Sequence, residues 1–234
     1  MKQQVLSVVD RLARRAARSM AFSKPRGDSF DIMEMAFFKA ALDSAEYYEK
    51  HSPACPSFDT DLALLSKALD LARPEGLFLE FGVATGRTIN HMARHRNEAH
   101  FYGFDSFEGL PEVWRSGFEK GAFAQALPPV PPNTTLIKGW FDHTLPEFLK
   151  AQPGRPLSFL HVDCDLYSST RTIFANLKDR IATGTVIVFD EYWNYPGWRE
   201  HEFKAFEELK AETGLRAEAF GFVSSHQQVG FIIT

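Results

Sequence analysis

The sequence of 234 residues has few cysteines, no excess of basic charge and no long apolar run, and each shortage excludes a class of protein. Its two cysteines, Cys55 and Cys164, cannot build a disulfide framework or a zinc ribbon, which favours a reducing compartment and therefore a cytoplasmic location. The formal net charge of -4 argues against a nucleic-acid partner, which would select a basic surface. No apolar run reaches membrane-spanning length, so we expect no integral association with a membrane.

The N-terminal segment carries a helical pattern of its own. Apolar residues recur at helical spacing on one face, namely Val5, Val8, Val9 and Leu12, and arginines fall on another face. Such a basic amphipathic helix could touch a membrane or act as a transit segment, but an arm that packs on the domain or on a partner subunit is the simpler interpretation. We expect residues 1–58 to form this helical arm or lid, and residues 59–234 to form the main domain.

Beyond the arm, short apolar runs alternate with helical segments. The runs are "LFLEFG", "HFYGFD", "TTLIKG", "LSFLHVD" and "GTVIVFDE", which begin at residues 77, 100, 134, 157 and 184. Runs that are apolar on both faces and joined by helices are typical of parallel strands buried in an α/β sheet. Near the C-terminus, "AEAFGF" and "QVGFIIT" are separated by a short polar link, which predicts an antiparallel hairpin at the end of the sheet.

Capping signals predict where several helices begin. A helix is expected over residues 30–48, and Asp59 or Thr60 can cap the next helix. That helix would turn four apolar side chains inward, namely Leu62, Leu65, Leu69 and Ala72. The "TLPE" at residues 144–147 matches a capping box with Pro in the first turn, and Ser168 or Ser169 can cap a helix through Leu177.

The turn after the first of these strands is rich in glycine. Gly82, Ala84 and Gly86 form a G-x-A-x-G loop in "LEFGVATGRT", and Glu80 lies two residues ahead of it. The G-x-G-x-x-G pattern of a dinucleotide site is lacking. Because an acid beside the loop repels phosphate and attracts an ammonium group, the loop favours a cationic amino-acid ligand over a pyrophosphate. A purely structural turn is the alternative.

An acid also ends the next strand. Asp105 lies about 20 residues beyond the glycine loop, where an acid can accept hydrogen bonds from the hydroxyls of a ribose. The alternative is an Asp that caps the turn before "SFEGLP". Two acids at successive strand ends that flank a glycine loop are less expected by accident than either acid alone.

Together these motifs resemble those of class I S-adenosylmethionine-dependent methyltransferases, and more narrowly the macrocin O-methyltransferase-like family of macrolide-sugar and aminocoumarin-sugar enzymes. The resemblance covers roughly residues 77–198 and rests on "LEFGVATGRT", "FYGFDSFEGLPE", "KGWFDHTLPEFL", "HVDCDLYSSTRTIFANL" and "VIVFDEYW". It implies a Rossmann-like, mostly parallel sheet of seven strands with the last strand antiparallel, helices on both faces, and an N-terminal helical extension that serves as a lid or homodimer contact. It also implies an S-adenosylmethionine site, to which we assign Glu80, Gly82, Val83, Ala84, Gly86, Thr88, Asp105, Ser106, Trp140 and Asp163.

Two later strand ends carry further acids. Asp163 ends one strand, and Asp190 with Glu191 ends another. By the same resemblance, Asp163, Asp190 and Glu191 bind a divalent metal, for which Mg²⁺ is suited, and Asp165 acts as the general base. The family pattern often has two Asp where this chain has Asp190 and Glu191. An alternative without metal therefore stays open, in which Glu191 forms a salt bridge and Asp163 contacts substrate or cofactor.

Other polar residues allow more than one interpretation. His143 and His161 are both candidate bases, although His161 lies in an apolar strand and suits a core histidine. We interpret His91 and His95 as surface residues, and Cys164 as a packing residue, since the acids on either side raise the pKa of its thiol. Four aromatic side chains could wall an acceptor or cover the edge of the core, namely Tyr192, Trp193, Tyr195 and Trp198.

The resemblance implies O-methylation of a hydroxyl on a sugar or another small-molecule natural product. A D-x-D after a strand also occurs in metal-dependent glycosyltransferases and in phosphatases with an aspartate nucleophile. Tyr167 stands where the phosphatase pattern needs Thr or Val, and a glycosyltransferase leaves Glu80 and the glycine loop unexplained. A catalytically inactive cofactor-binding protein is the third alternative.

Overall fold

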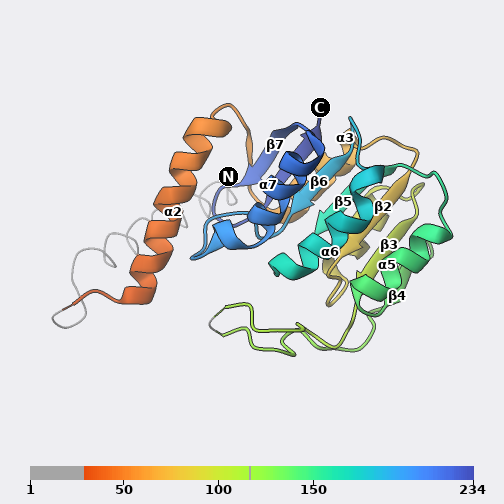
Figure 1. The fold of residues 1–234 in the computed structure, drawn as a ribbon, viewed down its shortest axis with the longest axis horizontal. Coiled ribbons are helices and arrows are strands. Elements are labelled where there is room, and N and C mark those ends of the chain that lie inside the picture. The colour runs from red at the N-terminus through yellow and green to blue at the C-terminus, as the bar shows by residue number, and fades with distance from the viewer. Residues whose placement is uncertain (1–28, 116) are drawn as a thin grey trace, which may run out of the picture.

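The computed structural model describes residues 29–115 and 117–234, and the helix expected at the start of the chain lies outside them. Within these residues one sheet of eight strands carries the fold (Figure 1). The strands are β1 (Ser57–Phe58), β2 (Leu77–Phe81), β3 (Phe101–Asp105), β4 (Thr134–Lys138), β5 (Leu157–Val162), β6 (Val186–Phe189), β7 (Ala217–Val223) and β8 (Val229–Ile233).

The strand order is β1-β7-β8-β6-β5-β2-β3-β4. From β4 to β6 the neighbouring strands run parallel, and β8 is antiparallel to both β6 and β7. This topology confirms the α/β class, the C-terminal hairpin and the antiparallel last strand. The chain leaves β2 toward β3 and β4 and then returns to β5 on the other side of β2. Ligands of open α/β sheets bind at such a switch point.

The sheet has one strand more than the seven expected. β1 consists of Ser57 and Phe58, which pair parallel with Phe222 and Val223 of β7. A strand of two residues is too short to show an alternating pattern, and a proline stands directly before it. The sequence therefore predicts no strand at this position, where the structure has an edge strand.

Helices cover both faces of the sheet. They are α2 (Ile32–His51), α3 (Asp61–Leu71), α4 (Arg87–His95), α5 (Phe141–Lys150), α6 (Tyr167–Leu177) and α7 (Glu202–Thr213), with short 3-10 turns η1 (Lys178–Arg180) and η2 (Trp198–Glu200). In Figure 1, α5, α6 and α7 lie on the near face, and α2 extends away from the sheet. In the described part of the chain, no helix combines the length and the apolar character that crossing a bilayer requires.

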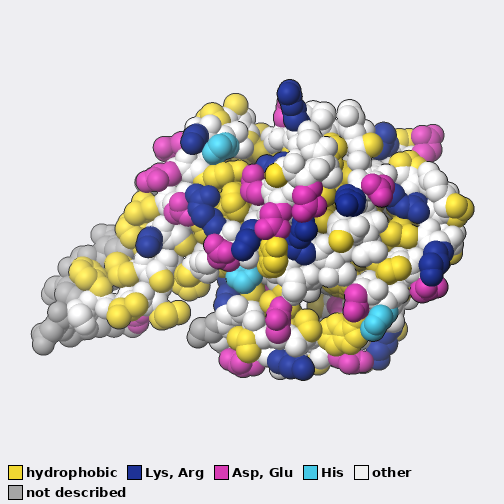
Figure 2. Space-filling model, viewed as in Figure 1, with side chains coloured by type: hydrophobic (Ala, Val, Ile, Leu, Met, Phe, Trp, Pro, Cys, Tyr) yellow, Lys and Arg dark blue, Asp and Glu magenta, His cyan; other side chains and the backbone are white. Residues whose placement is uncertain are grey.

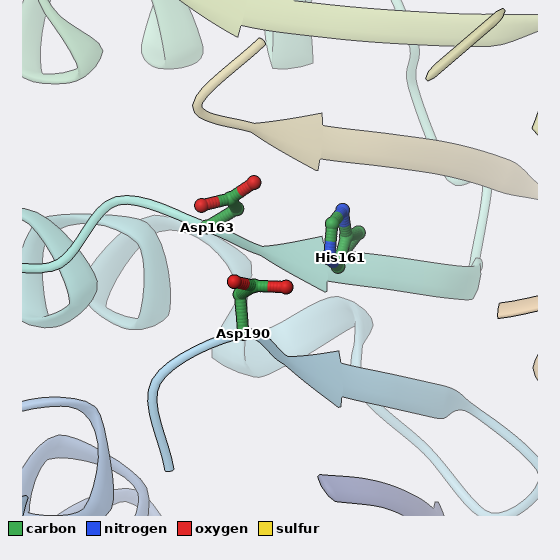
Figure 3. Close-up of side chains that lie close together, drawn as sticks. All are labelled: His161, Asp163 and Asp190. Atoms are coloured by element: carbon green, nitrogen blue, oxygen red, sulfur yellow. The ribbon is translucent and has the colours of Figure 1, made fainter. Parts of the chain in front are cut away.

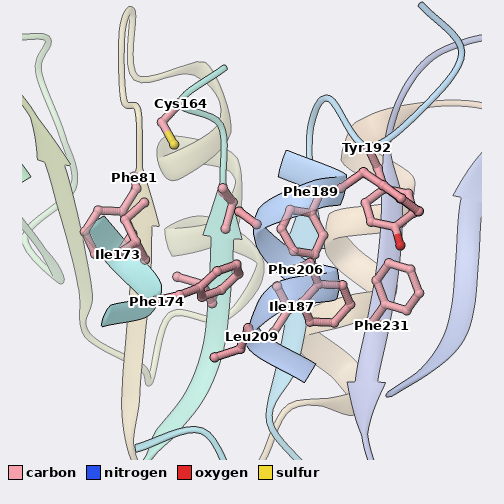
Figure 4. Packing of buried hydrophobic residues seen from close by; sticks show 14 of the residues in the cluster. Phe81, Cys164, Ile173, Phe174, Ile187, Phe189, Tyr192, Phe206, Leu209 and Phe231 are labelled. Atoms are coloured by element: carbon pink, nitrogen blue, oxygen red, sulfur yellow. The ribbon is translucent and has the colours of Figure 1, made fainter. Parts of the chain in front are cut away.

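Alternation along the central strands sends their side chains into two hydrophobic cores. Phe81 of β2 and Phe189 of β6 pack with Phe174 of α6 and Phe206 of α7 in the core under α5, α6 and α7 (Figure 4). Phe78 of β2 points to the opposite face, into the core under α3 and α4. Burial on both faces explains why these strands are nearly continuous apolar runs in the sequence.

The predicted helix starts agree with the structure in part. Thr60 caps α3, because its Oγ1 accepts a hydrogen bond from the backbone N–H of Ala63 at 3.1 Å. The capping box at residues 144–147 is wrong, since α5 begins at Phe141 and Thr144 donates instead to the carbonyl of Trp140 at 3.0 Å. A hydroxyl that finds an acceptor one turn back no longer caps a helix.

The serine cap of α6 is also wrong. The helix begins at Tyr167 with no side-chain cap, and Ser168 donates to the carboxylate of Glu112 at 2.6 Å. Glu112 lies in the segment between β3 and β4, so sequence spacing gives no hint of this competing partner.

The C-terminal half of α2 docks on the segment that follows β6. Arg199 donates two hydrogen bonds to the carboxylate of Asp43, both at 2.9 Å. Ser44 accepts the backbone N–H of Asn194 at 2.9 Å, and the ring of Tyr47 packs edge-on against the aromatic residues there. The rest of α2 exposes apolar side chains, which lie at the left of the space-filling view (Figure 2), namely Ile32, Met33, Phe37 and Leu42.

Candidate active site

A cavity of about 560 Å³ opens at the carboxyl edge of the sheet, at the ends of β2, β3 and β5. The segment that links β3 to β4, residues 106–133, supplies much of its opposite wall through Leu110, Trp114, Arg115, Phe118 and Phe123. A cavity of this size suits a small-molecule ligand. Its place coincides with the switch point of the sheet, where the sequence puts its acids.

The glycine loop forms one side of this cavity. Gly82 has a φ of 89°, and a Cβ at this position would overlap the backbone carbonyl of Asp163 at the end of β5. The glycine is therefore required because two strand ends approach closely. Ala84 also has a positive φ, of 45°, which is uncommon for a residue with a side chain and is often found at functional sites.

Asp105 holds this loop in place. Its Oδ2 accepts the backbone N–H groups of Val83 at 2.9 Å and Ala84 at 2.8 Å, and its Oδ1 accepts that of Phe107 at 2.7 Å. A carboxylate has about four acceptor positions, so these bonds leave about one for a ligand hydroxyl. Asp105 lines the cavity, and both interpretations from the sequence, turn residue and ligand contact, fit its position.

The structure divides the predicted cofactor residues into two groups. Six of them line the cavity, namely Gly82, Ala84, Asp105, Ser106, Trp140 and Asp163. The other four are not among the lining residues, namely Glu80, Val83, Gly86 and Thr88. Gly86 starts α4 with a φ of 78°, and Pro128 from the β3–β4 segment covers it. A ligand in this cavity could therefore contact the glycine loop, Asp105 and Trp140 together.

Glu80 has a different place from the one the sequence suggests. It is fully buried, and its Oε1 lies 2.9 Å from Nδ1 of His161, which is fully buried too. The two residues are partners in the register of β2 and β5, so their side chains emerge on the same face of the sheet. Burial raises the pKa of Glu80, and His161 opposes that shift. The expected contact of Glu80 with an ammonium ligand stays a prediction, and in this structure its Oε1 faces His161.

The acids at the ends of β5 and β6 separate into two groups. A ring nitrogen of His161 and carboxylate oxygens of Asp163 and Asp190 lie within 4.8 Å of one another (Figure 3). Glu191 is not among the residues of this group, although its pKa is raised by burial first and by the charges of Asp190, Asp165 and Asp163 second. Glu191 lines the cavity instead, and its backbone N–H donates to Glu202 at 3.1 Å. Two acids of the predicted metal set, Asp163 and Asp190, thus lie together beside His161, and the assignment of Glu191 as a metal ligand stays a prediction.

Burial and mutual repulsion make it hard to ionise all these acids. Burial raises the pKa of Asp163 well above its ordinary value, and Asp190 and Asp165 add to the shift. The pKa values of Glu191 and Glu202 are raised in the same way, by burial first and by neighbouring carboxylates second. An acid cluster of this kind holds protons at neutral pH unless a cation is present.

Asp165, the predicted base, faces the cavity from a strained backbone. It is 7% exposed and has a φ of 62°, so its carboxyl group has a fixed direction. Burial and the charge of Asp190 raise its pKa to about 7, and the guanidinium of Arg115 opposes that shift. A carboxyl group with a pKa near the working pH is suited to accept a proton.

His143, the second predicted base, does not line the cavity as Asp165 does. The side chain of His143 is 79% exposed, 3.7 Å from Asp142, and outside the cavity lining. His91 and His95 also lie away from the cavity, on α4, where they contact Ser66 and Asp70 of α3. His91 is half-buried against α3, so its surface assignment holds less well than that of His95.

Cys164 and the aromatic segment after β6 are packing residues. Cys164 is buried, and burial raises the pKa of its thiol well above the ordinary value. The aromatic side chains Tyr192, Trp193, Tyr195 and Trp198 are all buried in the core under α7, and none of them lines the cavity. Of the two interpretations, cover for the core edge is the one the structure supports.

Arg115 gives one wall of the cavity a positive charge that the sequence analysis did not predict. The guanidinium of Arg115 lies 3.8 Å from the ring centre of Trp114 and 4.9 Å from that of Tyr195. Its Nη1 is buried without a hydrogen-bond partner among the described residues. The signal was a "VWRSGF" stretch in the long segment after Asp105, where an Arg between aromatic residues faces the strand ends.

A family model described as a methyltransferase domain matches residues 79–192. These residues include the glycine loop, Asp105 and the acids at the ends of β5 and β6. This part of the chain is therefore similar to a methyltransferase domain.

Solved structures share the fold of this chain. A calicheamicin methyltransferase superposes with a TM-score of 0.59 at 20% identity, covering 89% of this chain and 99% of that chain. The O-methyltransferase NovP gives a TM-score of 0.56 at 19% identity and covers 73% of this chain and 78% of that chain. The Rossmann-like arrangement expected from the sequence is therefore confirmed.

Two curated relatives match part of this chain in sequence. The 8-demethyl-8-(2,3-dimethoxy-alpha-L-rhamnosyl)-tetracenomycin-C 4'-O-methyltransferase of Streptomyces olivaceus is 33% identical over 108 residues, which are 38% of this chain and 40% of the relative. The demethyldecarbamoylnovobiocin O-methyltransferase of Streptomyces niveus is 26% identical over 134 residues, which are 49% of this chain and 48% of the relative. The matches span less than half the length of either relative.

Proposed function

We propose that this protein transfers a methyl group from S-adenosylmethionine to a hydroxyl oxygen on a sugar or another small-molecule natural product. The observation that carries the proposal is Asp165, a buried carboxyl group on the wall of the switch-point cavity with a pKa raised to about 7. The names of both curated relatives, O-methyltransferases of natural products, support the choice of acceptor.

The residues around the cavity fit an S-adenosylmethionine site. When bound, this cofactor supplies an electrophilic methyl group on a positively charged sulfur. Asp105 keeps an acceptor position for a ribose hydroxyl, and Trp140 offers an indole beside an adenine. The acid-lined edge, with Asp163 and Asp165, favours a cationic sulfonium over a phosphate.

Asp165 then has the role of general base. As the bond between the acceptor oxygen and the methyl carbon forms, the bond between that carbon and sulfur breaks, and S-adenosylhomocysteine leaves. The hydroxyl proton passes to the carboxylate of Asp165. Arg115 keeps part of this carboxylate ionised near neutral pH, because its positive charge lowers the pKa of Asp165. The cavity walls hold the oxygen in line with the methyl group.

A divalent cation, with Mg²⁺ the ion expected from the sequence, fits the acids beside this base. Asp163 and Asp190 would hold it. Because burial and the charge of Asp190 raise the pKa of Asp163, a bound cation would stabilise the ionised form of these carboxyl groups. When bound, such a cation attracts the acceptor oxygen and lowers the pKa of its hydroxyl. Glu191, which points to the cavity, stays available for a polar group of the acceptor.

The acceptor pocket and the N-terminal arm complete the proposal. Apolar faces on which a sugar or an aromatic ring can stack lie beside Arg115, on Trp114, Phe118 and Phe123.

We propose that residues 1–58 act as an arm or lid and that the exposed apolar face of α2 forms a homodimer contact. The two free cysteines are consistent with a cytoplasmic, reducing location.

A panel of ligands tests this function. The melting temperature of the wild type should rise with S-adenosylmethionine and with S-adenosylhomocysteine, and stay unchanged with UDP-glucose or NAD. Trp140→Ala should lose most of the rise, while Trp193→Phe, outside the cavity, should keep it. A shift with UDP-glucose alone would favour a glycosyltransferase and overturn the proposal.

A further inference from the structure

Arg115 has hydrogen-bond donors that the described protein does not use. Its side chain lines the cavity, and its Nη1 is buried without a hydrogen-bond partner among the described residues. None of the ion pairs within residues 29–115 and 117–234 includes Arg115. A guanidinium carries five N–H donors, and buried donors are normally satisfied, so the unpaired Nη1 needs an explanation.

Three aromatic rings hold the guanidinium of Arg115 in place. Its central carbon lies 3.8 Å from the ring centre of Trp114, 4.9 Å from that of Tyr195 and 5.1 Å from that of Phe118. The faces of such rings attract a cation, but they do not replace acceptors in the plane of its N–H groups. Arg115 is thus fixed on the cavity wall with donors left for a ligand.

The guanidinium lies at the end of the cavity that also holds the proposed base. Tyr195, which stacks beside it, donates from its hydroxyl to the backbone carbonyl of Glu191 at 3.3 Å, and Glu191 and Asp165 both line the cavity. The cofactor is proposed to lie elsewhere, along the glycine loop and Asp105 at the ends of β2 and β3. The donors of Arg115 therefore belong to the part of the cavity that is left for the acceptor.

From this arrangement we infer that the acceptor carries a carboxylate and that Arg115 is the residue that binds it. The planar fork of a guanidinium fits the two oxygens of a carboxylate through parallel N–H···O hydrogen bonds. A phosphate fits less well, because its higher negative charge meets the carboxyl groups of Asp165 and Glu191 on the same wall. The inference rests on the proposed function and adds the class of acceptor, a hydroxylated molecule with one carboxylate.

Matched probes that differ in charge test this inference. D-glucuronate and D-glucuronamide represent sugar acids, and 3,4-dihydroxybenzoate and its amide represent aromatic acids. Their dissociation constants would be measured by NMR titration of the wild type saturated with S-adenosylhomocysteine. In at least one pair the carboxylate should bind about 10-fold more tightly than the amide, because hydrogen bonds between charged groups are the stronger ones. The pair with this preference identifies the source of the carboxylate.

Variants of Arg115 assign the preference to its side chain. Arg115→Met should reduce it to less than about 3-fold, and Arg115→Lys should keep part of it, since an ammonium retains the charge but not the fork. Arg171→Met, on the α6–α7 surface, is the matched control and should keep the full preference. The base does not mimic this result, because a neutral Asp165 in Arg115→Met would repel a carboxylate less.

The wild type alone can overturn the inference, so no variant has to fold. Equal binding of carboxylate and amide in both pairs would overturn it, and so would a preference that Arg115→Met keeps. Weaker S-adenosylhomocysteine binding in Arg115→Met, without a preference in the wild type, would assign the guanidinium to the carboxylate of the cofactor and overturn it too. Failure of S-adenosylhomocysteine to bind wild type would count against the proposed function alone, since the pairs measured without it still decide the role of Arg115.

Discussion

Replacing the proposed base should stabilise the metal-free protein, and more so at high pH. The pKa of an Asp in an unfolded chain is about 3.9. Burial raises the pKa of Asp165 in the folded protein to about 7, with Asp190 adding to the shift and Arg115 opposing it. Between these two values the folded state binds more protons than the unfolded state, so the free energy of unfolding falls as the pH rises.

The size of this effect follows from the two pKa values. Relative to a side chain that stays neutral, Asp165 lowers the free energy of unfolding by about 1.5 kcal/mol at pH 5 and by about 4 kcal/mol at pH 8. Asp165→Asn removes the ionisable group and keeps the shape of the side chain. Its stability relative to wild type should therefore be about 2.5 kcal/mol more favourable at pH 8 than at pH 5.

Urea unfolding in EDTA at both pH values measures this difference. Asp59→Asn, at an exposed position, is the control and should differ from wild type by less than about 0.5 kcal/mol at either pH. The same Asp165→Asn protein should be inactive, because its amide cannot accept the hydroxyl proton. A gain in stability together with a loss of activity is expected of a functional site. A difference between Asp165→Asn and wild type that does not change with pH, or a variant less stable than wild type at pH 8, would refute the reasoning.

Three further predictions concern other parts of the protein. Gly82→Ala should lower the free energy of unfolding by more than about 3 kcal/mol, because its Cβ meets the carbonyl of Asp163, whereas Gly154→Ala, with a similar φ and open space, should cost about 1 kcal/mol. Arg115→Met should move the acid limb of the pH profile of kcat/KM upward by about one unit, since the guanidinium lowers the pKa of Asp165. Phe37→Glu, on the exposed face of α2, should convert a dimer to a monomer in analytical ultracentrifugation.

Each of these has its own control or contrary outcome. Equal losses in Gly82→Ala and Gly154→Ala would show that φ alone, and not the close approach, sets the cost. Arg171→Met, on the α6–α7 surface, should leave the pH profile in place, and a shift there equal to that of Arg115→Met would contradict a local effect. A wild type that sediments as a monomer would remove the proposed α2 contact.

The sequence predicted the elements that have a strong pattern. The buried parallel strands are continuous apolar runs, and the C-terminal hairpin has two runs with a short link, so both could be read directly. β1 could not, since two residues carry no pattern. The cap of α6 failed because Ser168 found Glu112, a partner far away in the sequence.

The site was predicted to the level of strand ends and no further. Position in the chain showed that Asp105, Asp163 and Asp190 meet at one edge of the sheet. It did not show which side chains contact one another, since the pairing of Glu80 with His161 depends on the register between β2 and β5. The interpretation of His161 as a core residue agrees with its full burial.

Transfer of a labelled methyl group tests the central claim most directly. Wild type, S-adenosylmethionine with a ¹³C methyl group, Mn²⁺ or Mg²⁺, and a panel of deoxysugar-bearing acceptors would be analysed by mass spectrometry. We predict one methylated hydroxyl and an equal amount of S-adenosylhomocysteine, with the product lost in Asp165→Asn although that variant still binds S-adenosylhomocysteine. Full activity in Asp165→Asn, or a wild type that binds neither S-adenosylmethionine nor its demethylated product, would contradict the account.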